Sequence, residues 1–309
     1  MGFYHEPVML DEVIKGLNIK KSGIYLDCTL GGGGHTKAIS KIASDGRVIS
    51  IDRDEEAILN FEKERDSYPN VTVVKDNFLN IDKVLRDLKV NKVDGALIDL
   101  GVSSHQLDKG ERGFSYSENY ELDMRMNKEQ KLSARHIVNG YTKDELREII
   151  YNYGEEKWAD RIAEFIVKER QDRFIETTFD LVEIIKKAIP KSARIDGPHP
   201  AKRTFQAIRI EVNKELDVIE PTIKKIVNSL NKNGIICVIT FHSLEDRIVK
   251  NTFKWLEKDC ICPPKQPICN CDKKKEIKII TKKPIEASKK EIERNPRSRS
   301  AKLRIAKKI

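Results

Sequence analysis

The 309-residue sequence predicts an α/β protein in which a parallel sheet is interrupted by an all-helical domain. Over the first hundred residues, short apolar runs alternate with segments of helical periodicity, which favours parallel strands joined by right-handed crossovers. The alternation returns after residue 200, and the residues between show helical periodicity without a convincing strand. We therefore expect residues 1–106 and 200–309 to form one domain and residues 107–199 to form an inserted helical domain.

Four apolar runs in the first half of the chain are predicted strands, and a carboxylate stands at or just after the end of each. The strands are residues 24–28, 47–51, 71–74 and 93–98, and the carboxylates are Asp27, Asp52, Asp76 and Asp99. Taken singly, each carboxylate is also typical of a helix N-cap or a turn. Because the carboxyl ends of parallel strands share one rim, the four together predict a ligand site there.

The central part of the chain carries helix signals. Capping boxes predict helices that begin after Thr142 and Thr177, the second being stopped by Pro190. Between them, Trp158, Ile162, Phe165 and Ile166 have the spacing of one helical face. These helices make up the expected insertion.

The last third of the chain is expected to complete the sheet. A long helix from about 204 to 230 should break or kink at Pro221, and residues 235–241 should form the fifth strand. A capping box at Ser243 predicts the helix that follows. The runs 276–280 and 301–305 are expected to form an antiparallel pair at the end of the sheet.

Four consecutive glycines, Gly31 to Gly34, follow the first strand. Such a turn lets a ligand approach the backbone, and the helix after it offers unpaired N–H groups, although a flexible surface turn explains a glycine run equally well. Asp52 lies 21 residues after Gly31, the spacing of a carboxylate that accepts hydrogen bonds from ribose hydroxyls. Asp27 would repel a pyrophosphate but suits the cationic amino-acid end of S-adenosylmethionine, and Phe78 could stack on adenine. This pattern is typical of a class I (Rossmann-like) methyltransferase sheet.

Longer blocks of sequence carry a specific resemblance. They are residues 5–10, 31–35, 51–54, 99–107, 112–115, 122–126, 199–206, 241–247 and 295–300. In this order they resemble the bacterial RsmH (MraW) family. The resemblance implies a cytoplasmic enzyme that uses S-adenosylmethionine to methylate the exocyclic N4 amine of one cytidine near the decoding centre of 16S ribosomal RNA. Its substrate would be the small ribosomal subunit or a precursor of it.

The resemblance also implies roles for individual residues. Gly33, Gly34 and His35 would line the methionine side of the cofactor, Asp52 the ribose, Phe78 the adenine, and Asp99 and Gln106 the reacting end. A cytosine amine is a poor nucleophile, so the enzyme must align it and accept hydrogen bonds from its N–H groups. Asp99, at a strand end, is the expected catalytic residue. No metal ligand is expected in this site.

Aromatic and basic side chains are the candidates for RNA binding. Phe114, Phe205, Phe241 and His242 could hold a splayed base, although Phe205 and Phe241 are equally typical of core residues. Lys202, Arg203, Arg209, Arg297 and Arg299 are candidate phosphate contacts or, alternatively, a solvated face. Residues 250–309 hold 19 Lys or Arg against 7 Asp or Glu, a net of +12 within a chain of net +9. This basic end suggests a polyanionic partner.

The six cysteines fall into two groups. Cys28 and Cys237 lie in predicted strands and have the character of small core residues. Cys260-x-Cys262 and Cys269-x-Cys271 form two tight pairs, which suggests either four zinc ligands or free or redox-active thiols. The C-x-C spacing is shorter than the usual zinc spacing, and the family resemblance does not require a metal.

Two other functions share these features. A nicotinamide-dependent oxidoreductase would have the same kind of sheet, and a non-catalytic ribosome-assembly factor would explain the basic end. The chain has no apolar run long enough to span a bilayer and no secretory signal pattern at its start, so no membrane role is expected. The oligomeric state stays open, a homodimer included.

Overall fold

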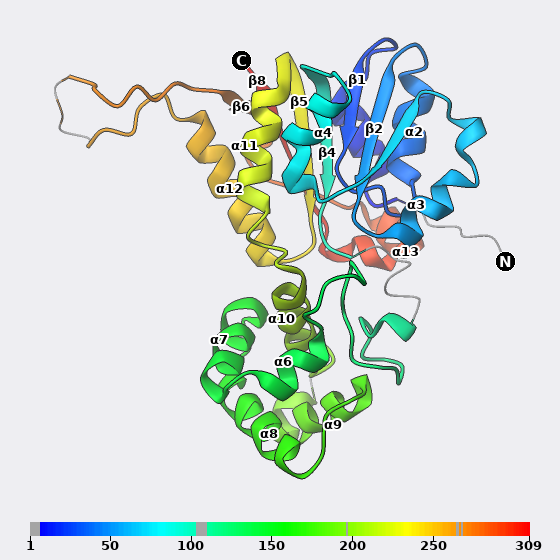
Figure 1. Cartoon of the computed structure of the whole chain (residues 1–309). Helices are drawn as coiled ribbons and strands as arrows, with labels where there is room; N and C mark the ends of the chain where they lie inside the picture. The colour runs from blue at the N-terminus through cyan, green and yellow to red at the C-terminus, as the bar shows by residue number, and fades with distance from the viewer. Residues whose placement is uncertain (1–6, 103–109, 196, 264–265, 267) are drawn as a thin grey trace. The chain divides into compact units, whose positions relative to one another are not determined.

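A computed structural model of the chain describes residues 7–102, 110–195, 197–263, 266 and 268–309 (Figure 1). The chain divides into two compact units, one made of Met1–Gly101 with Leu216–Ile309 and the other of Val102–Glu215. We call them the sheet unit and the helical unit. Within the described residues, no helix has both the length and the apolar character needed to cross a membrane.

The sheet unit contains an eight-stranded sheet with the order β3-β2-β1-β4-β5-β8-β6, and β7 pairs with β8. Its strands are β1 (Ile24–Asp27), β2 (Arg47–Asp52), β3 (Val71–Lys75), β4 (Val93–Asp99), β5 (Leu230–Thr240), β6 (Ile277–Ile279), β7 (Ile285–Glu286) and β8 (Lys302–Lys308). Neighbours from β3 to β5 are parallel, and β8 is antiparallel to β5, β6 and β7. The order reverses between β1 and β4, which is where open α/β sheets bind ligands.

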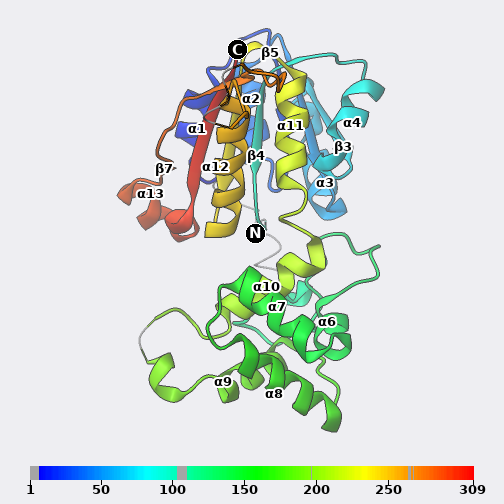
Figure 2. The same ribbon diagram turned by 90° about the vertical axis from the view of Figure 1, so that its left-hand side faces the viewer.

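Alternating strand residues face two separate cores. Tyr25 and Leu97 belong to one core, whereas Leu26 and Ile98 belong to the other, as the period of two in a strand requires. The covering helices are α1 (Leu10–Leu17), α2 (Gly34–Ile42) and α3 (Glu55–Glu62) on the first face, and α4 (Ile81–Asp87), α11 (Ile219–Ser229) and α12 (Ser243–Glu257) on the second. α11 and α12 lie side by side (Figure 2). α13 (Lys289–Arg294) precedes β8.

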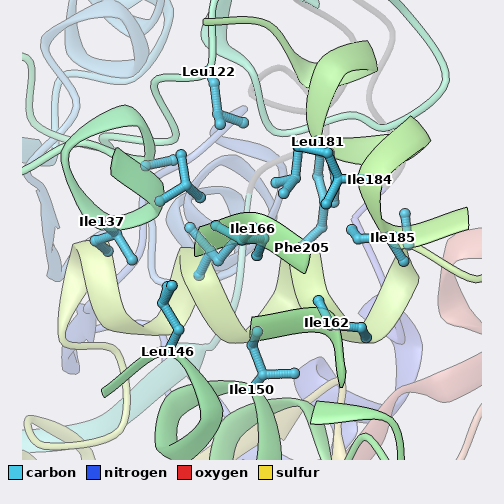
Figure 3. Packing of buried hydrophobic residues seen from close by; sticks show 14 of the residues in the cluster. Leu122, Ile137, Leu146, Ile150, Ile162, Ile166, Leu181, Ile184, Ile185 and Phe205 are labelled. Carbon is cyan, nitrogen blue, oxygen red and sulfur yellow. The ribbon is translucent and has the colours of Figure 1, made fainter. Parts of the chain in front are cut away.

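The helical unit has a hydrophobic core of its own (Figure 3). Its helices are α6 (Ala134–Gly140), α7 (Lys143–Gly154), α8 (Ala159–Asp172), α9 (Thr178–Ala188) and α10 (Lys202–Asn213). The predicted capping boxes at Thr142 and Thr177 are confirmed, since each hydroxyl accepts a hydrogen bond from the backbone three residues later. Phe205, labelled in Figure 3, places the buried face of α10 in this core.

Two predictions for the segment that leads from the helical unit back to the sheet are wrong. The long helix breaks at Lys214, whose φ is +50°, and not at Pro221. Pro221 lies in the first turn of α11, where the missing N–H has no intrahelical partner to lose. Because the apolar face of α10 packs in the helical unit, the sheet unit resumes at Leu216 and not at residue 200.

Candidate active site

The glycine turn connects the end of β1 to α2. Gly31 and Gly33 have φ of +48° and +76°, which side chains rarely adopt, and Gly33 is the N-cap of α2. A Cβ atom on Gly33 would lie 2.9 Å from the Phe61 ring. The sequence therefore uses glycine here for both conformation and space. The turn directs the N-terminus of α2 toward the rim of the sheet.

Asp52 holds this turn from the end of β2. One carboxylate oxygen accepts a hydrogen bond from the Gly31 N–H at 2.8 Å, and the other accepts from the Asp54 N–H at 2.9 Å. Burial raises the pKa of Asp52 despite these two donors. The side chain stays partly exposed, and each oxygen keeps a further lone pair for a ligand.

Asp27 lies at the end of β1 but is fully buried. Its carboxylate accepts hydrogen bonds from the Thr36 hydroxyl at 2.7 Å and the Thr29 N–H at 3.1 Å. Burial raises the pKa of Asp27 to about 7. The expectation that Asp27 meets the cofactor is therefore wrong, because no part of this side chain reaches the surface. Asp27 instead stabilises the glycine turn through its hydrogen bonds with Thr29 and Thr36.

Asp99 ends β4, beside β1 at the reversal of strand order. Its N–H donates to the Thr29 hydroxyl at 2.9 Å, which ties the two strand ends together. Oδ1 of Asp99 is buried and has no hydrogen-bond partner among the described residues, while 24% of the side-chain surface is exposed. Burial, together with the charges of Asp27 and Glu245, raises the pKa of Asp99 well above its ordinary value. Such a group ionises readily only when a cation lies next to it.

His35, the second residue of α2, faces Asp99. Its Nδ1 lies 3.7 Å from Oδ2 of Asp99, and its Nε2 lies 3.1 Å from the carbonyl oxygen of Val8. Because a carbonyl only accepts hydrogen bonds, Nε2 carries a proton, and Nδ1 of the neutral ring is left as an acceptor. The imidazole therefore has a fixed orientation beside the Asp99 carboxyl group.

Glu245 is a further carboxylate whose charge acts on Asp99, and the sequence analysis did not select it. It is 1% exposed and accepts hydrogen bonds from the N–H groups of Phe241 at 2.7 Å and His242 at 3.3 Å. The N-cap of α12 is His242, with Glu245 at the third helical position, so the predicted cap at Ser243 is wrong by one residue. The capping-box spacing in the sequence was the signal that could have identified Glu245, but it was assigned with Ser243 as the N-cap in place of His242. Asp27, Asp99 and Glu245 together favour a cationic ligand.

The other predicted cofactor residues are placed as follows. Phe78 begins a short 3₁₀ helix after β3 and is half-buried, with Asn77 accepting a hydrogen bond from the Leu79 N–H at 2.9 Å. Gly34 opens α2. Gln106 lies outside the described residues.

Two of the four aromatic candidates for base binding are core residues. Phe114 and Phe205 are 5% and 3% exposed within the core of the helical unit, so neither offers a free ring face. Phe241 is half-buried, and a Cβ on Gly101 would lie 3.3 Å from its ring. The helical unit also holds a stacked pair that the sequence analysis missed, Tyr116 and His199, with ring centroids 4.6 Å apart.

The basic residues predicted to contact phosphates differ in whether their charge is already paired. Arg209 forms two hydrogen bonds of 3.0 and 2.9 Å with Glu215, so its charge is already paired within the helical unit. Lys202 and Arg203 are exposed in that unit. Arg297 and Arg299 are exposed in the sheet unit.

The comparisons with known proteins bear on this rim. A model of the MraW methylase family matches residues 2–309. The chain belongs to the MraW methylase family. This MraW-family chain is 58% identical over 311 residues to the ribosomal RNA small subunit methyltransferase H of Clostridioides difficile (strain 630), with both chains fully covered. It is also 58% identical over 310 residues to the protein of that name from Clostridium botulinum (strain Kyoto / Type A2), again over both full lengths.

Two solved structures are similar to the MraW-family chain. One is a putative methyltransferase from Streptococcus mutans in complex with SAH, with a TM-score of 0.45, 12% identity and coverage of 99% of this chain and 100% of that one. The other is a putative rRNA-methylase from Clostridium thermocellum, with a TM-score of 0.45, 14% identity and the same coverage. The strand order of the sheet unit, which reverses between β1 and β4, confirms the Rossmann-like α/β sheet that the sequence predicted.

Proposed function

We propose that the protein is an S-adenosylmethionine-dependent methyltransferase that methylates the exocyclic N4 of a cytidine in 16S ribosomal RNA near the decoding centre. Family membership over residues 2–309 and full-length identity to two small subunit rRNA methyltransferases support this function. The structural observation that best supports this function concerns Asp99. Its buried Oδ1 has no partner among the described residues and lies at the strand-order reversal, beside the glycine turn.

The rim suits S-adenosylmethionine, which when bound supplies a methyl group carried on a positively charged sulfur. Gly33, Gly34 and His35 would hold its methionine part, and Asp52 would accept hydrogen bonds from its ribose. Phe78 would lie against its adenine, and Gln106, by resemblance, near the reacting end. The Asp99 carboxylate, with the buried Asp27 and Glu245 close enough to raise its pKa, would stabilise the positive charge of the cofactor. Its charge in turn favours the ionised form of Asp99.

Asp99 would act on the cytosine amine. As N4 gains the methyl group it must lose one proton, and an ionised Asp99 can accept hydrogen bonds from N4 and then that proton. Much of the rate acceleration would come from holding the amine in line, because the amine lone pair is delocalised into the ring. The His35 imidazole lies beside the Asp99 carboxyl group, with Nδ1 3.7 Å from Oδ2, which is too far for a hydrogen bond.

A nicotinamide-dependent oxidoreductase fits this rim less well. A pyrophosphate near the N-terminus of α2 would raise the pKa of Asp27 and Asp99 further, whereas a cation favours their ionised forms. A non-catalytic assembly factor would not explain why the buried Oδ1 of Asp99 has no hydrogen-bond partner among the described residues.

The substrate is proposed to be 16S rRNA within the small ribosomal subunit or a precursor of it, in the cytoplasm. We assign substrate recognition to the helical unit, whose exposed Lys202 and Arg203 can contact phosphates, and to the basic end of the chain with Arg297 and Arg299. The protein could act as a monomer or a homodimer, which sedimentation would distinguish.

Purified protein tests the proposal directly. Calorimetry should show binding of S-adenosylhomocysteine and none of NAD. With labelled S-adenosylmethionine and small subunits isolated from cells that lack the gene, the label should appear as N4-methylcytidine in 16S rRNA. Binding of NAD alone, or label on a different atom, would contradict the proposed function.

A further inference from the structure

The four cysteines of the C-terminal region form one cluster outside the active site. Cys260, Cys262, Cys269 and Cys271 bring their Sγ atoms within 4.8 Å of one another. Neighbouring sulfurs are 3.6 Å apart for the pair 260 and 269, 3.9 Å for 262 and 269, 3.5 Å for 269 and 271, and 3.8 Å for 260 and 271. Both C-x-C pairs therefore contribute to a single group of sulfur atoms.

These distances fit a metal ion better than a disulfide. In a tetrahedral site with Zn–S bonds of about 2.3 Å, neighbouring sulfurs are separated by about 3.8 Å. The four distances, from 3.5 to 3.9 Å, fall around this value. A disulfide requires an S–S distance of about 2.0 Å and joins two sulfurs only. Cys269 instead lies at a similar distance from three other sulfurs.

Backbone N–H groups point at the cluster. The Ile261 N–H donates to Sγ of Cys271, and the Cys262 N–H donates to Sγ of Cys260, each at 3.4 Å. Hydrogen bonds of this kind stabilise the negative charge of a metal-bound thiolate. The backbone between the paired cysteines is thus arranged for sulfur ligands that carry charge.

The described parts of the segment that holds the cluster have no regular secondary structure to order them. Residues 258–276 join α12 to β6, and their described parts contain no helix or strand (Figure 1, orange). Both ends of the segment are tied down, since the Glu276 N–H donates to the Leu256 carbonyl at 2.9 Å and the Ile279 N–H donates to Glu257 at 2.8 Å. Between these ends the cysteines are exposed or half-buried, so burial of apolar surface does not explain why they converge.

Charge balance agrees with a metal-bound cluster. Residues 258–276 contain five Lys and three Asp or Glu, a net of +2. Four thiolates around a divalent cation carry a net of −2, which these lysines offset. A tetrahedral set of four sulfurs is the donor set that zinc prefers among common divalent ions.

We propose that Cys260, Cys262, Cys269 and Cys271 bind one zinc ion, which orders the described parts of the segment between α12 and β6. The site is separate from the rim that holds Asp99, and it stands whether or not the protein methylates RNA. Its role is structural, because four protein ligands leave no open position on the metal.

Metal analysis of protein purified without chelator tests the site. We expect about one zinc ion per chain, and four thiols that react with a thiol reagent only after the zinc is removed. Replacement by cobalt should give the visible absorption of a tetrahedral tetrathiolate. The double variant Cys260→Ser/Cys262→Ser should lose the zinc, whereas the matched control Cys237→Ala, which changes a buried cysteine of β5, should keep it.

A second readout does not depend on any variant. Removal of zinc from the wild-type chain should speed tryptic cleavage after Lys274 and Lys275, whose side chains are already exposed, while the far-ultraviolet circular dichroism of the sheet stays unchanged. Zinc below about a tenth of an equivalent in the wild-type protein would overturn the proposal. Iron in place of zinc, or zinc retained by the double serine variant, would overturn it as well.

Discussion

Ionisation of Asp99 makes cofactor binding depend on pH. The pKa of Asp99 is raised well above its ordinary value by burial and by the charges of Asp27 and Glu245. The neutral carboxyl must lose its proton to stabilise a cation, so binding of S-adenosylmethionine should release a proton below this pKa. The association constant should then fall tenfold, or about 1.4 kcal/mol, for each pH unit below the pKa of Asp99.

Calorimetry in buffers with different ionisation enthalpies measures this proton release. The wild-type protein should release close to one proton at a pH below the Asp99 pKa and none well above it. Asp99→Asn should remove the pH dependence. The matched control Asp82→Asn, which changes a carboxylate that pairs with Lys225 on the surface, should preserve it. The reasoning would be refuted if Asp99→Asn kept the wild-type slope.

Three further predictions concern the turn that supports Asp99. Gly33→Ala should destabilise the protein by about 1–2 kcal/mol, because φ of Gly33 is +76° and the new Cβ would meet the Phe61 ring. Gly32→Ala, at a glycine without a positive φ, is the control and should destabilise the protein less. Urea unfolding measures both changes in stability. Thr36→Val should cost about 1–3 kcal/mol because it removes the 2.7 Å hydrogen bond to Asp27, and an unchanged unfolding midpoint would contradict this. The pKa of Asp27 is about 7 in the folded protein, against 3.8 in the unfolded chain, so between these values the folded protein binds more protons than the unfolded chain. The contribution of Asp27 to the free energy of unfolding should therefore fall by about 4 kcal/mol as the pH rises from about 4 to 7. The unfolding free energy of Asp27→Asn, measured across that range, should lack this component.

The sequence predicted the elements of the sheet because their signals are local. Alternating apolar runs identified the strands, and side-chain oxygens three residues from their backbone partners identified the caps at Thr142 and Thr177. The break in the long helix was misplaced for the same reason. Proline signals a break by itself, but in the first turn of α11 Pro221 causes none.

The errors in the site come from contacts that are distant in the sequence. Whether a carboxylate at a strand end is exposed at the rim or buried beneath it depends on its hydrogen-bond partners. Asp27 is buried because it accepts a hydrogen bond from Thr36, nine residues later in the sequence. Glu245 lies in α12, more than two hundred residues after β1, and its charge raises the pKa of Asp99. The sequence left Phe205 open to either a core or a base-binding role, and only its packing in the helical unit decides between them.

In the proposed function, Asp99 acts in methyl transfer to a cytidine of 16S rRNA. Mass spectrometry of 16S rRNA, from cells that lack the gene and carry either the wild-type gene or Asp99→Ala, tests it most directly. The wild-type gene should restore N4 methylation of one cytidine near the decoding centre, and Asp99→Ala, expressed to the same level, should leave that cytidine unmodified at N4. Full methylation by Asp99→Ala, or none by the wild-type protein, would contradict the account.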